Sequence, residues 1–401
     1  MIAPDEALRL VLEKSLALAY EEIAAVEACG RILSEPLSAR EDLPGFDNCA
    51  MDGYALRAAD ASGASKDSPR ALTLVLGARA GGPSTEAVGP GQAARVLTGA
   101  PLPPGADCVV MQELTAPDGG GRMRILQEPE PGQHVRERGE DVRAGQPLLD
   151  AGAILRPIEI GLLAAQGVSV VRVVRRPRAA LLSTGDELAR PAPGSGLRDS
   201  NGPALAAACA RWGAAVHRLN PVGDDRAAIA AAARAALAEA DMLLLTGGVS
   251  VGDFDFTRPA LEDLGAEIVF AGVAIKPGKP LLFALVGGKP VFGLPGNPVS
   301  ALVCAEEFVR PCLERLQGRP GSTRSFHIQG EAACDYPLHN ERRHYLFCRA
   351  RLEEGLWRLD IIRPQGSARL GMASRADALA AAEGGPRTVK AGETLWFRWI
   401  K

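Results

Sequence analysis

Residues 242–300 carry most of the side chains that could do chemistry. An apolar run at 242–245 is followed by a polar, glycine-rich segment that contains Thr246, Gly247, Gly248, Ser250, Asp253 and Asp255. In an open α/β sheet, a strand that stops at glycines and then presents polar side chains forms part of a site at the carboxyl edge. Glycines let backbone N–H groups approach phosphate oxygens, and the Ser250 hydroxyl adds a donor. This segment therefore predicts a site for a phosphorylated substrate.

Two lysines and a helix start lie further along the same stretch. Lys276 and Lys279 flank a Pro–Gly turn and supply positive charge for an oxyanion. After a second apolar run, Asn297 can cap a helix whose first position suits Pro298. The free N–H groups at the start of such a helix also favour an anion. The sequence thus predicts a second, positively charged part of the site.

Carboxylates that follow predicted strands suggest a metal at this edge. They are hard oxygen ligands suited to Mg²⁺ held together with substrate phosphates, and they comprise Asp186, Glu187, Asp253 and Asp255. The chain has no G-x-x-x-x-G-K-[ST] loop and no G-x-G-x-x-G fingerprint, which disfavours a P-loop NTPase and a dinucleotide oxidoreductase. Its five histidines show no metal-ligand spacing. No nucleophile–base pair stands out, so covalent catalysis lacks support.

The elements that must position these residues alternate between strands and helices from residue 178 onward. Apolar runs predict strands at 179–182, 215–219, 242–245, 267–270, 281–286 and 291–294. Helical patterns lie between or after them at 199–212, 224–240, 258–264 and 299–316. This alternation favours a mostly parallel sheet covered by helices on both faces. In such a sheet, the polar loops gather at one crevice.

The regions on either side follow other patterns. Apolar spacing predicts two helices at 4–19 and 21–33. Short β-rich runs between residues 71 and 150 alternate with Gly/Pro turns, which indicates a small inserted barrel or sandwich. Residues 325–401 alternate apolar and polar side chains, which indicates an antiparallel β domain with a polar glycine loop at 365–367.

Polar loops in the N-terminal part have less certain roles. Residues 43–55 place two acids, an amide and an aromatic between a Pro–Gly pair and a glycine, and both a surface turn and a functional loop remain open. Residues 98–107 form a rigid, proline-set loop. Residues 136–141 mix both charge signs, which is typical of a solvated face.

Composition limits the class of protein. A chain of 401 residues is too long for one ordinary core, so two to four domains are expected. A net charge of −3 gives no case for nucleic-acid binding. The eight cysteines include no C-x-x-C pair, which favours reduced thiols in the cytoplasm. Neither a signal peptide nor a membrane span is indicated.

Several motifs, in order along nearly the whole chain, resemble those of the molybdopterin molybdenumtransferase family, which is MoeA in bacteria and is similar to the E domains of gephyrin and its plant counterpart. These motifs are FDNCAMDGYAL (46–56), LTGAPLPPGADCVV (97–110), GEDVRAG (139–145), STGDEL (183–188), DSNG (199–202), TGGVSVGDFDF (246–256), IKPGKP (275–280), GLPGNPVS (293–300) and QGSARL (365–370).

The resemblance implies a multidomain α/β fold. It implies an elongated helical and β N-terminal region over 1–176 with a small β domain inserted at about 55–145. A central three-layer α/β domain like that of MogA, with a mostly parallel sheet, would cover 177–320, and a C-terminal β barrel would cover 324–401. It further implies a homodimer whose active-site clefts are shared between subunits.

The implied reaction converts adenylylated molybdopterin and molybdate, with Mg²⁺, to molybdenum cofactor and AMP. Cleft residues from the N-terminal region would be Asp52, Thr98 and Asp141. Glu187 and Asp255, with Asp186 and Asp253, would bind the metal or the adenylylated substrate. Ser250, Gly247, Gly248 and Asn297 would serve the substrate, and the molybdate pocket would contain Lys276, Lys279, Pro280, Arg349 and Ser367. Transient contacts with the adenylyltransferase and with molybdoenzyme chaperones are also implied.

Alternatives remain at this stage. The approach to Arg349 is irregular, so Arg342 or Arg343 could be the pocket arginine instead. Gly371 and Met372 replace an expected pair of serines in the C-terminal loop. An adenylyltransferase that acts one step earlier shares the α/β domain, although the long flanking regions weigh against it. A non-catalytic scaffold, as in gephyrin, is the other alternative.

Overall fold

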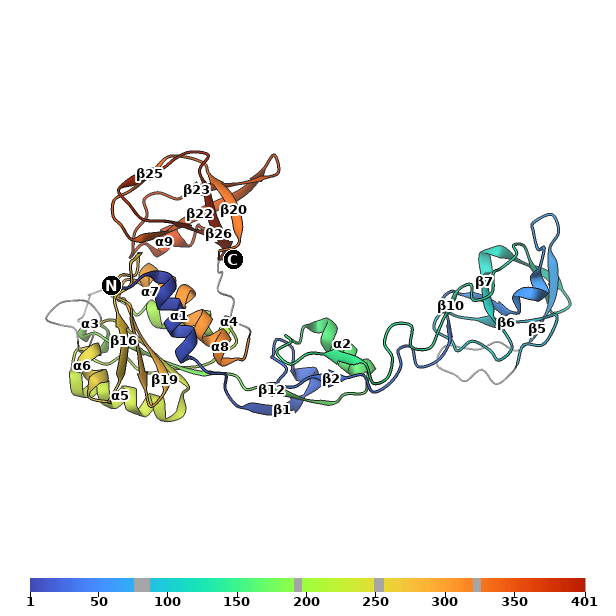
Figure 1. The fold of residues 1–401 in the computed structure, drawn as a ribbon, viewed down its shortest axis with the longest axis horizontal. Helices are drawn as coiled ribbons and strands as arrows, with labels where there is room; N and C mark the ends of the chain where they lie inside the picture. Colours follow the sequence, from blue (N-terminus) through green and yellow to red (C-terminus); the bar gives the residue numbers. More distant parts are fainter. Residues whose placement is uncertain (76–86, 191–196, 249–255, 320–325, 401) are drawn as a thin grey trace.

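The computed structural model describes residues 1–75, 87–190, 197–248, 256–319 and 326–400. The chain forms an elongated molecule in which an N-terminal arm extends from a central α/β domain that carries a β barrel (Figure 1). The expected fold class is therefore confirmed. Among the described helices, none is long and apolar enough to cross a membrane.

The central domain is built around a six-stranded sheet. Its strands, in spatial order, are β14 (Ala215–Arg218), β13 (Arg178–Ser183), β15 (Met242–Thr246), β19 (Lys289–Leu294), β18 (Leu282–Val286) and β16 (Glu267–Ala271). The first four are parallel, and the last two pairings are antiparallel. The predicted mostly parallel sheet is correct.

Helices cover both faces of this sheet. They are α3 (Asp186–Ala189), α4 (Asn201–Arg211), α5 (Arg226–Glu239), α6 (Thr257–Glu262), α7 (Pro298–Cys304), the π-helix η4 (Ala305–Val309) and α8 (Arg310–Leu316). Leu243 and Leu244 are consecutive in β15, yet they belong to different hydrophobic clusters, one on each face. This alternation explains why the strand is apolar throughout.

The chain begins with α1 (Pro4–Lys14), which packs on the central domain and buries Ala7 and Val11 in its core. Strand β1 (Tyr20–Ala24) then pairs antiparallel with β12 (Val170–Val174). Nearby elements are η1 (Ala25–Glu27), β2 (Leu37–Ser38), β11 (Pro147–Leu149) and α2 (Pro157–Ala165). The predicted helix at 21–33 is therefore wrong, because pairing with a distant strand overrides a local apolar pattern.

A small β domain lies at the far end of the arm (Figure 1). Its six-stranded sheet has the order β7-β4-β6-β5-β9-β8. The strands are β4 (Gly53–Leu56), β5 (Arg70–Val75), β6 (Gln92–Val96), β7 (Cys108–Met111), β8 (Thr115–Gly119) and β9 (Arg122–Ile125). The remaining elements are η2 (Ala58–Ala61), η3 (Gln112–Leu114) and the pair β3 (Asn48–Cys49) and β10 (Val135–Arg136).

The C-terminal domain is a closed barrel. Its elements are β20 (Ile328–Ala332), β21 (Tyr336–Leu338), β22 (Arg343–Glu353), β23 (Leu356–Ile361), α9 (Leu370–Ala373), β24 (Ala378–Ala382), β25 (Arg387–Val389) and β26 (Thr394–Trp399). The additional pairing of β22 with β24 closes the sheet. Strand β17 (Ile275–Lys276) leaves the central domain and pairs with β22, which joins the two domains.

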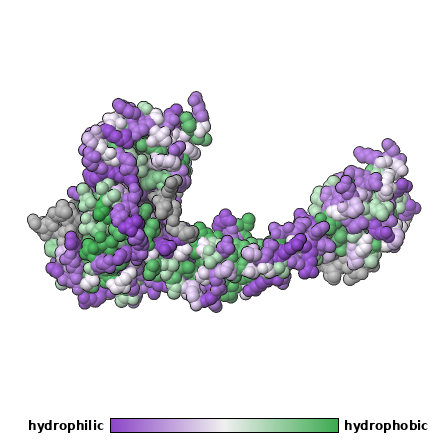
Figure 2. All heavy atoms as spheres, viewed as in Figure 1, coloured by the Kyte–Doolittle hydropathy of each residue, from purple (hydrophilic) through white to green (hydrophobic). Residues whose placement is uncertain are grey.

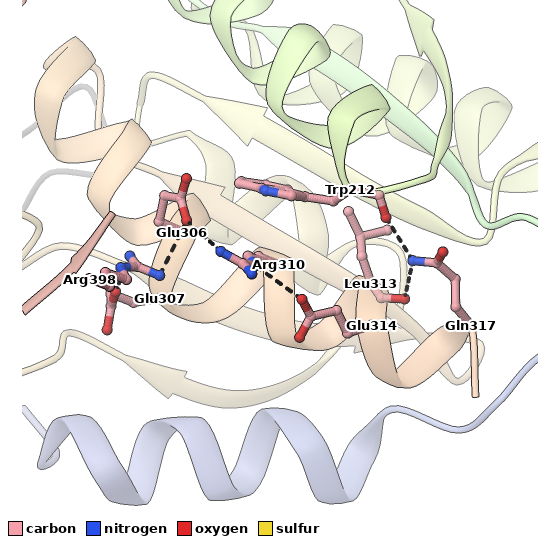
Figure 3. A network of polar contacts seen from close by, with 8 residues as sticks. All are labelled: Trp212, Glu306, Glu307, Arg310, Leu313, Glu314, Gln317 and Arg398. Carbon is pink, nitrogen blue, oxygen red and sulfur yellow. Dashed lines mark hydrogen bonds and ion pairs between the residues drawn. The ribbon is translucent and has the colours of Figure 1, made fainter. Parts of the chain in front are cut away.

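A buried ion pair also fastens the barrel to the central domain (Figure 3). The Arg398 side chain on β26 is 3% exposed and donates to Glu307 on η4, and its Nη1 lies 3.2 Å from Glu306. Burial raises the pKa of Glu307, while the charge of Arg398 acts in the opposite direction. The network continues through Arg310, which contacts Glu306 and Glu314.

We expect Arg398→Met to destabilise the protein by about 3–5 kcal/mol, because it leaves the Glu307 carboxylate buried without its cation. Adding Glu307→Gln should recover most of the loss, since the carboxylate charge is then removed. Thermal and urea midpoints measured by circular dichroism test this expectation. Arg351→Met, at an exposed arginine on β22, is the control. An Arg398→Met midpoint equal to that of the control would contradict the proposed role of the ion pair.

Candidate functional site

A cavity of about 440 Å³ lies where the central domain meets the barrel. It is lined by the β17 turn, the start of α7, the start of β22 and the loop at 365–367. Of the predicted site residues, the structure brings together Lys276, Lys279, Pro280, Asn297 and Ser367. No aspartate or glutamate is among the described residues that line it. The cavity is therefore suited to an anion.

Strand pairing across the domain boundary positions the cations. Ile275 lies opposite Arg343 and Lys276 lies opposite His344 in the parallel β17–β22 ladder. Gly278 shapes the turn between the two lysines, because its φ is +113° and a Cβ there would lie 2.6 Å from the Cys304 sulfur. The turn therefore requires a glycine.

Arg342 is the arginine that the structure brings to this cavity. Its Nε donates to Asn340 Oδ1 at 3.1 Å and its Nη1 donates to the Ile275 carbonyl at 3.3 Å. In the described part of the chain, Lys276, Lys279 and Arg342 form no ion pair with a carboxylate. Their charges therefore remain available to a ligand.

Arg349, the favoured sequence candidate, does not line the cavity. It is exposed on β22, and its Nε donates to the Arg375 carbonyl at 3.1 Å. It lies six positions after Arg343 along the strand, which is a distance of about 20 Å. Arg343 instead forms ion pairs with Asp5 at 2.7 Å and with Glu383 at 2.8 Å.

The start of α7 is capped by the barrel. The backbone N–H groups of Val299 and Ser300 donate to the Ser367 carbonyl at 2.9 and 3.3 Å. Asn297 occupies the N-cap position, but its side chain makes no capping hydrogen bond. The predicted capping by Asn297 and the predicted free helix N-terminus are therefore both wrong. The barrel loop satisfies these donors, and the loop is thereby fixed at the cavity.

A second group of polar residues lies at the carboxyl edge of the sheet. Thr246 and Asn201 are buried there, and Asn201 Nδ2 donates to Thr246 Oγ1 at 2.7 Å and to the Gly296 carbonyl at 2.9 Å. Asn201 Oδ1 has no hydrogen-bond partner among the described residues. Gly247 has a φ of +100°, and a Cβ there would lie 2.4 Å from the Thr184 carbonyl oxygen. Gly248 follows with a φ of +60°.

Asn201 received no individual role from the sequence, although it lies in the motif DSNG (199–202). The structure shows that it joins the ends of β15 and β19, which places an amide between the two halves of the candidate site. The predicted residues Ser250, Asp253 and Asp255 lie outside the described residues.

The described carboxylates at this edge fit the chemistry of Mg²⁺. Asp186 and Glu187 are exposed just beyond β13. Asp186 Oδ1 accepts from the Asp224 backbone at 3.2 Å. The carboxylate of Glu187 folds over Gly185, where a Cβ would lie 2.5 Å from Oε1. Within the described ranges, no group of three or more His, Cys, Asp or Glu side chains could hold a metal.

The N-terminal candidates form a separate group. Asp52 accepts from the Thr98 backbone and from its hydroxyl, both at 2.7 Å, and the hydroxyl hydrogen bond contributes most to lowering the pKa of Asp52. Asp141 is exposed, and its N–H donates to the Leu43 carbonyl at 3.0 Å. Asp52 directly precedes β4, Thr98 follows β6 and Asp141 follows β10, and these strands lie far from the barrel within one chain (Figure 1).

Family models match successive parts of the chain. They are the MoeA N-terminal region (domain I and II) at residues 2–167, a probable molybdopterin binding domain at 180–315, and the MoeA C-terminal region (domain IV) at 329–397.

Individual relatives cover most of the chain. The molybdopterin molybdenumtransferase of Bacillus subtilis is 33% identical over 410 residues, which span 100% of this chain and 94% of the relative. That of Nostoc sp. is 38% identical over 336 residues, which span 82% and 77%. The crystal structure of the molybdopterin biosynthesis MoeA protein from Pyrococcus horikoshii is 28% identical, covers 100% of both chains and has a TM-score of 0.83.

The fold and the matches define a multidomain transferase in which a MogA-like domain is combined with a β barrel. The chain belongs to the molybdopterin molybdenumtransferase family and functions in molybdenum cofactor biosynthesis.

Proposed function

We propose that the chain transfers molybdenum from molybdate to adenylylated molybdopterin and releases AMP. The cavity that contains Lys276, Lys279 and Arg342 carries this proposal, because these three cations, which form no ion pair with a described carboxylate, suit a doubly charged tetrahedral oxyanion. The Ser367 segment adds a hydroxyl to the same wall. Molybdate would therefore bind here, between the central domain and the barrel.

The adenylylated pterin would lie along the neighbouring carboxyl edge. Gly247 and Gly248 allow a close approach of backbone to phosphate, and the Oδ1 of Asn201, which has no partner among the described residues, can accept from a ligand donor. The rate of the reaction would then depend chiefly on holding the dithiolene group of the pterin beside molybdate. Such positioning converts a bimolecular encounter into an effectively unimolecular one. No protein nucleophile is required.

Mg²⁺ belongs to this proposal as a cofactor. Asp186 and Glu187, with Asp253 and Asp255, would hold it, since carboxylate oxygens are its preferred protein ligands. When bound, it would neutralise phosphate charge and polarise the phosphoanhydride. Asp186 and Glu187, just beyond β13, would keep the metal at the sheet edge, beside the place proposed for the nucleotide.

A homodimer with shared clefts is also proposed. Asp52, Thr98 and Asp141 adjoin or follow β4, β6 and β10, which lie too far from the barrel to reach the cavity of their own chain (Figure 1), so a second copy would have to supply them. The arm exposes large apolar side chains, which include Val26 at 76%, Ile158 at 72% and Val170 at 52%. Figure 2 shows apolar residues on the viewed face of the arm around α2. Burial of this surface would stabilise a dimer.

The cellular setting forms the final part of the proposal. Six of the eight cysteines are buried as free thiols, which suits a cytoplasmic protein. Transient contacts with the adenylyltransferase and with molybdoenzyme chaperones would deliver the substrate and remove the product.

A reconstituted reaction tests the proposed function. Purified protein with adenylylated molybdopterin, molybdate and Mg²⁺ is expected to release AMP in step with cofactor formation. Removal of the metal with EDTA should abolish AMP release, and added Mg²⁺ should restore it. Consumption of molybdopterin and ATP without AMP release from the adenylylated substrate would contradict the proposal. It would instead support an adenylyltransferase.

A further inference from the structure

One side chain in the oxyanion cavity presents a buried polar atom that no described residue satisfies. The His344 residue is 4% exposed, and its Nε2 has no hydrogen-bond partner among the described residues. It lines the same cavity as Lys276 and Lys279 and lies opposite Lys276 in the β17–β22 ladder. A buried polar atom without a hydrogen-bond partner destabilises a protein by roughly 1–3 kcal/mol. A ligand that supplies the missing partner would therefore bind more tightly.

The second nitrogen of the ring determines what Nε2 can offer. The imidazole hydrogen-bonds to the backbone of Asn340, and this contact favours the protonated ring. We assign the donor in that contact to Nδ1, because Nε2 has no partner among the described residues. Neutral His344 therefore presents an unprotonated Nε2, and a lone pair repels an oxyanion.

The surroundings keep His344 neutral while the cavity is empty. Burial lowers its pKa to about 4, and the positive charges of Lys276 and Arg342 act in the same direction. The charged and titratable groups around it are Lys276, Lys279, Arg342, His339, Tyr336 and Tyr345. An oxyanion reverses this balance, because its negative charge offsets the cations and supplies an acceptor for a proton on Nε2.

We propose that His344 takes up a proton when the oxyanion binds and donates it from Nε2 to an oxyanion oxygen. Binding at this cavity is then coupled to the uptake of one proton. The inference rests on the proposed function, since it concerns the same cavity. In the complex, the cavity therefore carries one more positive charge than it does in the free protein.

The sign of the pH dependence follows from this coupling. The pKa of His344 is low in the free protein and rises in the complex, so between these two values a proton is taken up on binding. In that range, the dissociation constant rises about tenfold for each unit of increasing pH. Above the pKa of the complex, His344 stays neutral in both states, and the dissociation constant no longer changes.

Calorimetry with molybdate tests the inference on the full chain. Titrations from about pH 6 to about pH 8, in buffers of different ionisation enthalpy, count the protons taken up. For the wild type we expect uptake that approaches one proton at the lower pH. The variant His344→Gln should bind molybdate without uptake, because the amide donates at the ε position without titrating. His217→Gln, at an exposed histidine on β14 that does not line the cavity, should behave like the wild type.

The outcomes separate this inference from the proposed function. Suppose that Lys276→Ala weakens binding strongly, but the wild type takes up no proton on binding at any pH. This result would overturn the role of His344 and leave the oxyanion site intact. If Lys276→Ala binds molybdate as tightly as the wild type does, both the oxyanion site and the role of His344 are overturned. The proton count on the wild type also stands alone should His344→Gln fail to fold.

Discussion

The double variant Lys276→Ala/Lys279→Ala is expected to bind molybdate roughly 10²–10⁴-fold more weakly than the wild type. Hydrogen bonds to charged groups contribute about 1.5–3 kcal/mol each, so two lysines account for about 3–6 kcal/mol. The effect should be large because no carboxylate is among the described residues that line the cavity. The lysines therefore attract molybdate and do not merely cancel a nearby negative charge. Calorimetric titration with molybdate measures it directly, and AMP release should fall in parallel.

A matched control separates the local effect from a change in net charge. Lys14, which forms a surface ion pair with Glu267, and Lys66, which is exposed in the small β domain, do not line the cavity, so Lys14→Ala/Lys66→Ala removes the same charge elsewhere. This control should bind like the wild type. Arg342→Ala should weaken binding, while Arg349→Ala should not. Unchanged affinity in Lys276→Ala/Lys279→Ala, or a loss only in Arg349→Ala, would contradict the cavity as the molybdate site.

The central sheet could be predicted because its strands are buried on both faces. Runs such as 242–245 and 291–294 consist of consecutive apolar residues, and they coincide with β15 and β19. Two glycines between apolar runs are also typical of a hairpin turn, and β18 and β19 pair antiparallel across Gly287 and Gly288. Elements whose identity depends on local sequence were thus predicted well.

Elements whose identity depends on distant partners were not predicted well from the sequence. Residues 21–33 have a helix-like apolar pattern, but β1 pairs with β12 about 150 residues further along the chain, which no local pattern reveals. The cap of α7 has the same origin, because Ser367 belongs to the barrel. Local propensity is a weak guide wherever such long-range contacts compete with it.

The candidate site shows the same division. The lysines and glycines could be found because their chemistry is evident from residue type and spacing. The choice between Arg342 and Arg349 could not, since it depends on which end of β22 meets β17. Asn201 was missed as well, because its contacts to Thr246 and Gly296 form only when two strands lie side by side.

The separation of Asp52 from the cavity leads to a second large expected effect. If a second copy supplies Asp52, Asp52→Ala and Lys276→Ala should each abolish most activity in a pure homodimer, since every cleft lacks one group. A co-expressed mixture should regain about one quarter of the wild-type AMP release. Half of the dimers are then mixed, and each mixed dimer has one cleft in which both groups are intact.

A mixture of Lys276→Ala with Lys279→Ala is the matched control for this complementation. Both residues belong to the same wall of the cavity, so each cleft of a mixed dimer still lacks one lysine and activity should stay low. Recovery in the first mixture but not in the second requires that Asp52 and Lys276 of one cleft come from different chains. Equal, low activity in both mixtures, with mixed dimers shown by native mass spectrometry, would mean that the arm does not complete the partner's cleft. The contacts of Asp52 with Thr98 would then serve only to hold the loop at the end of β6.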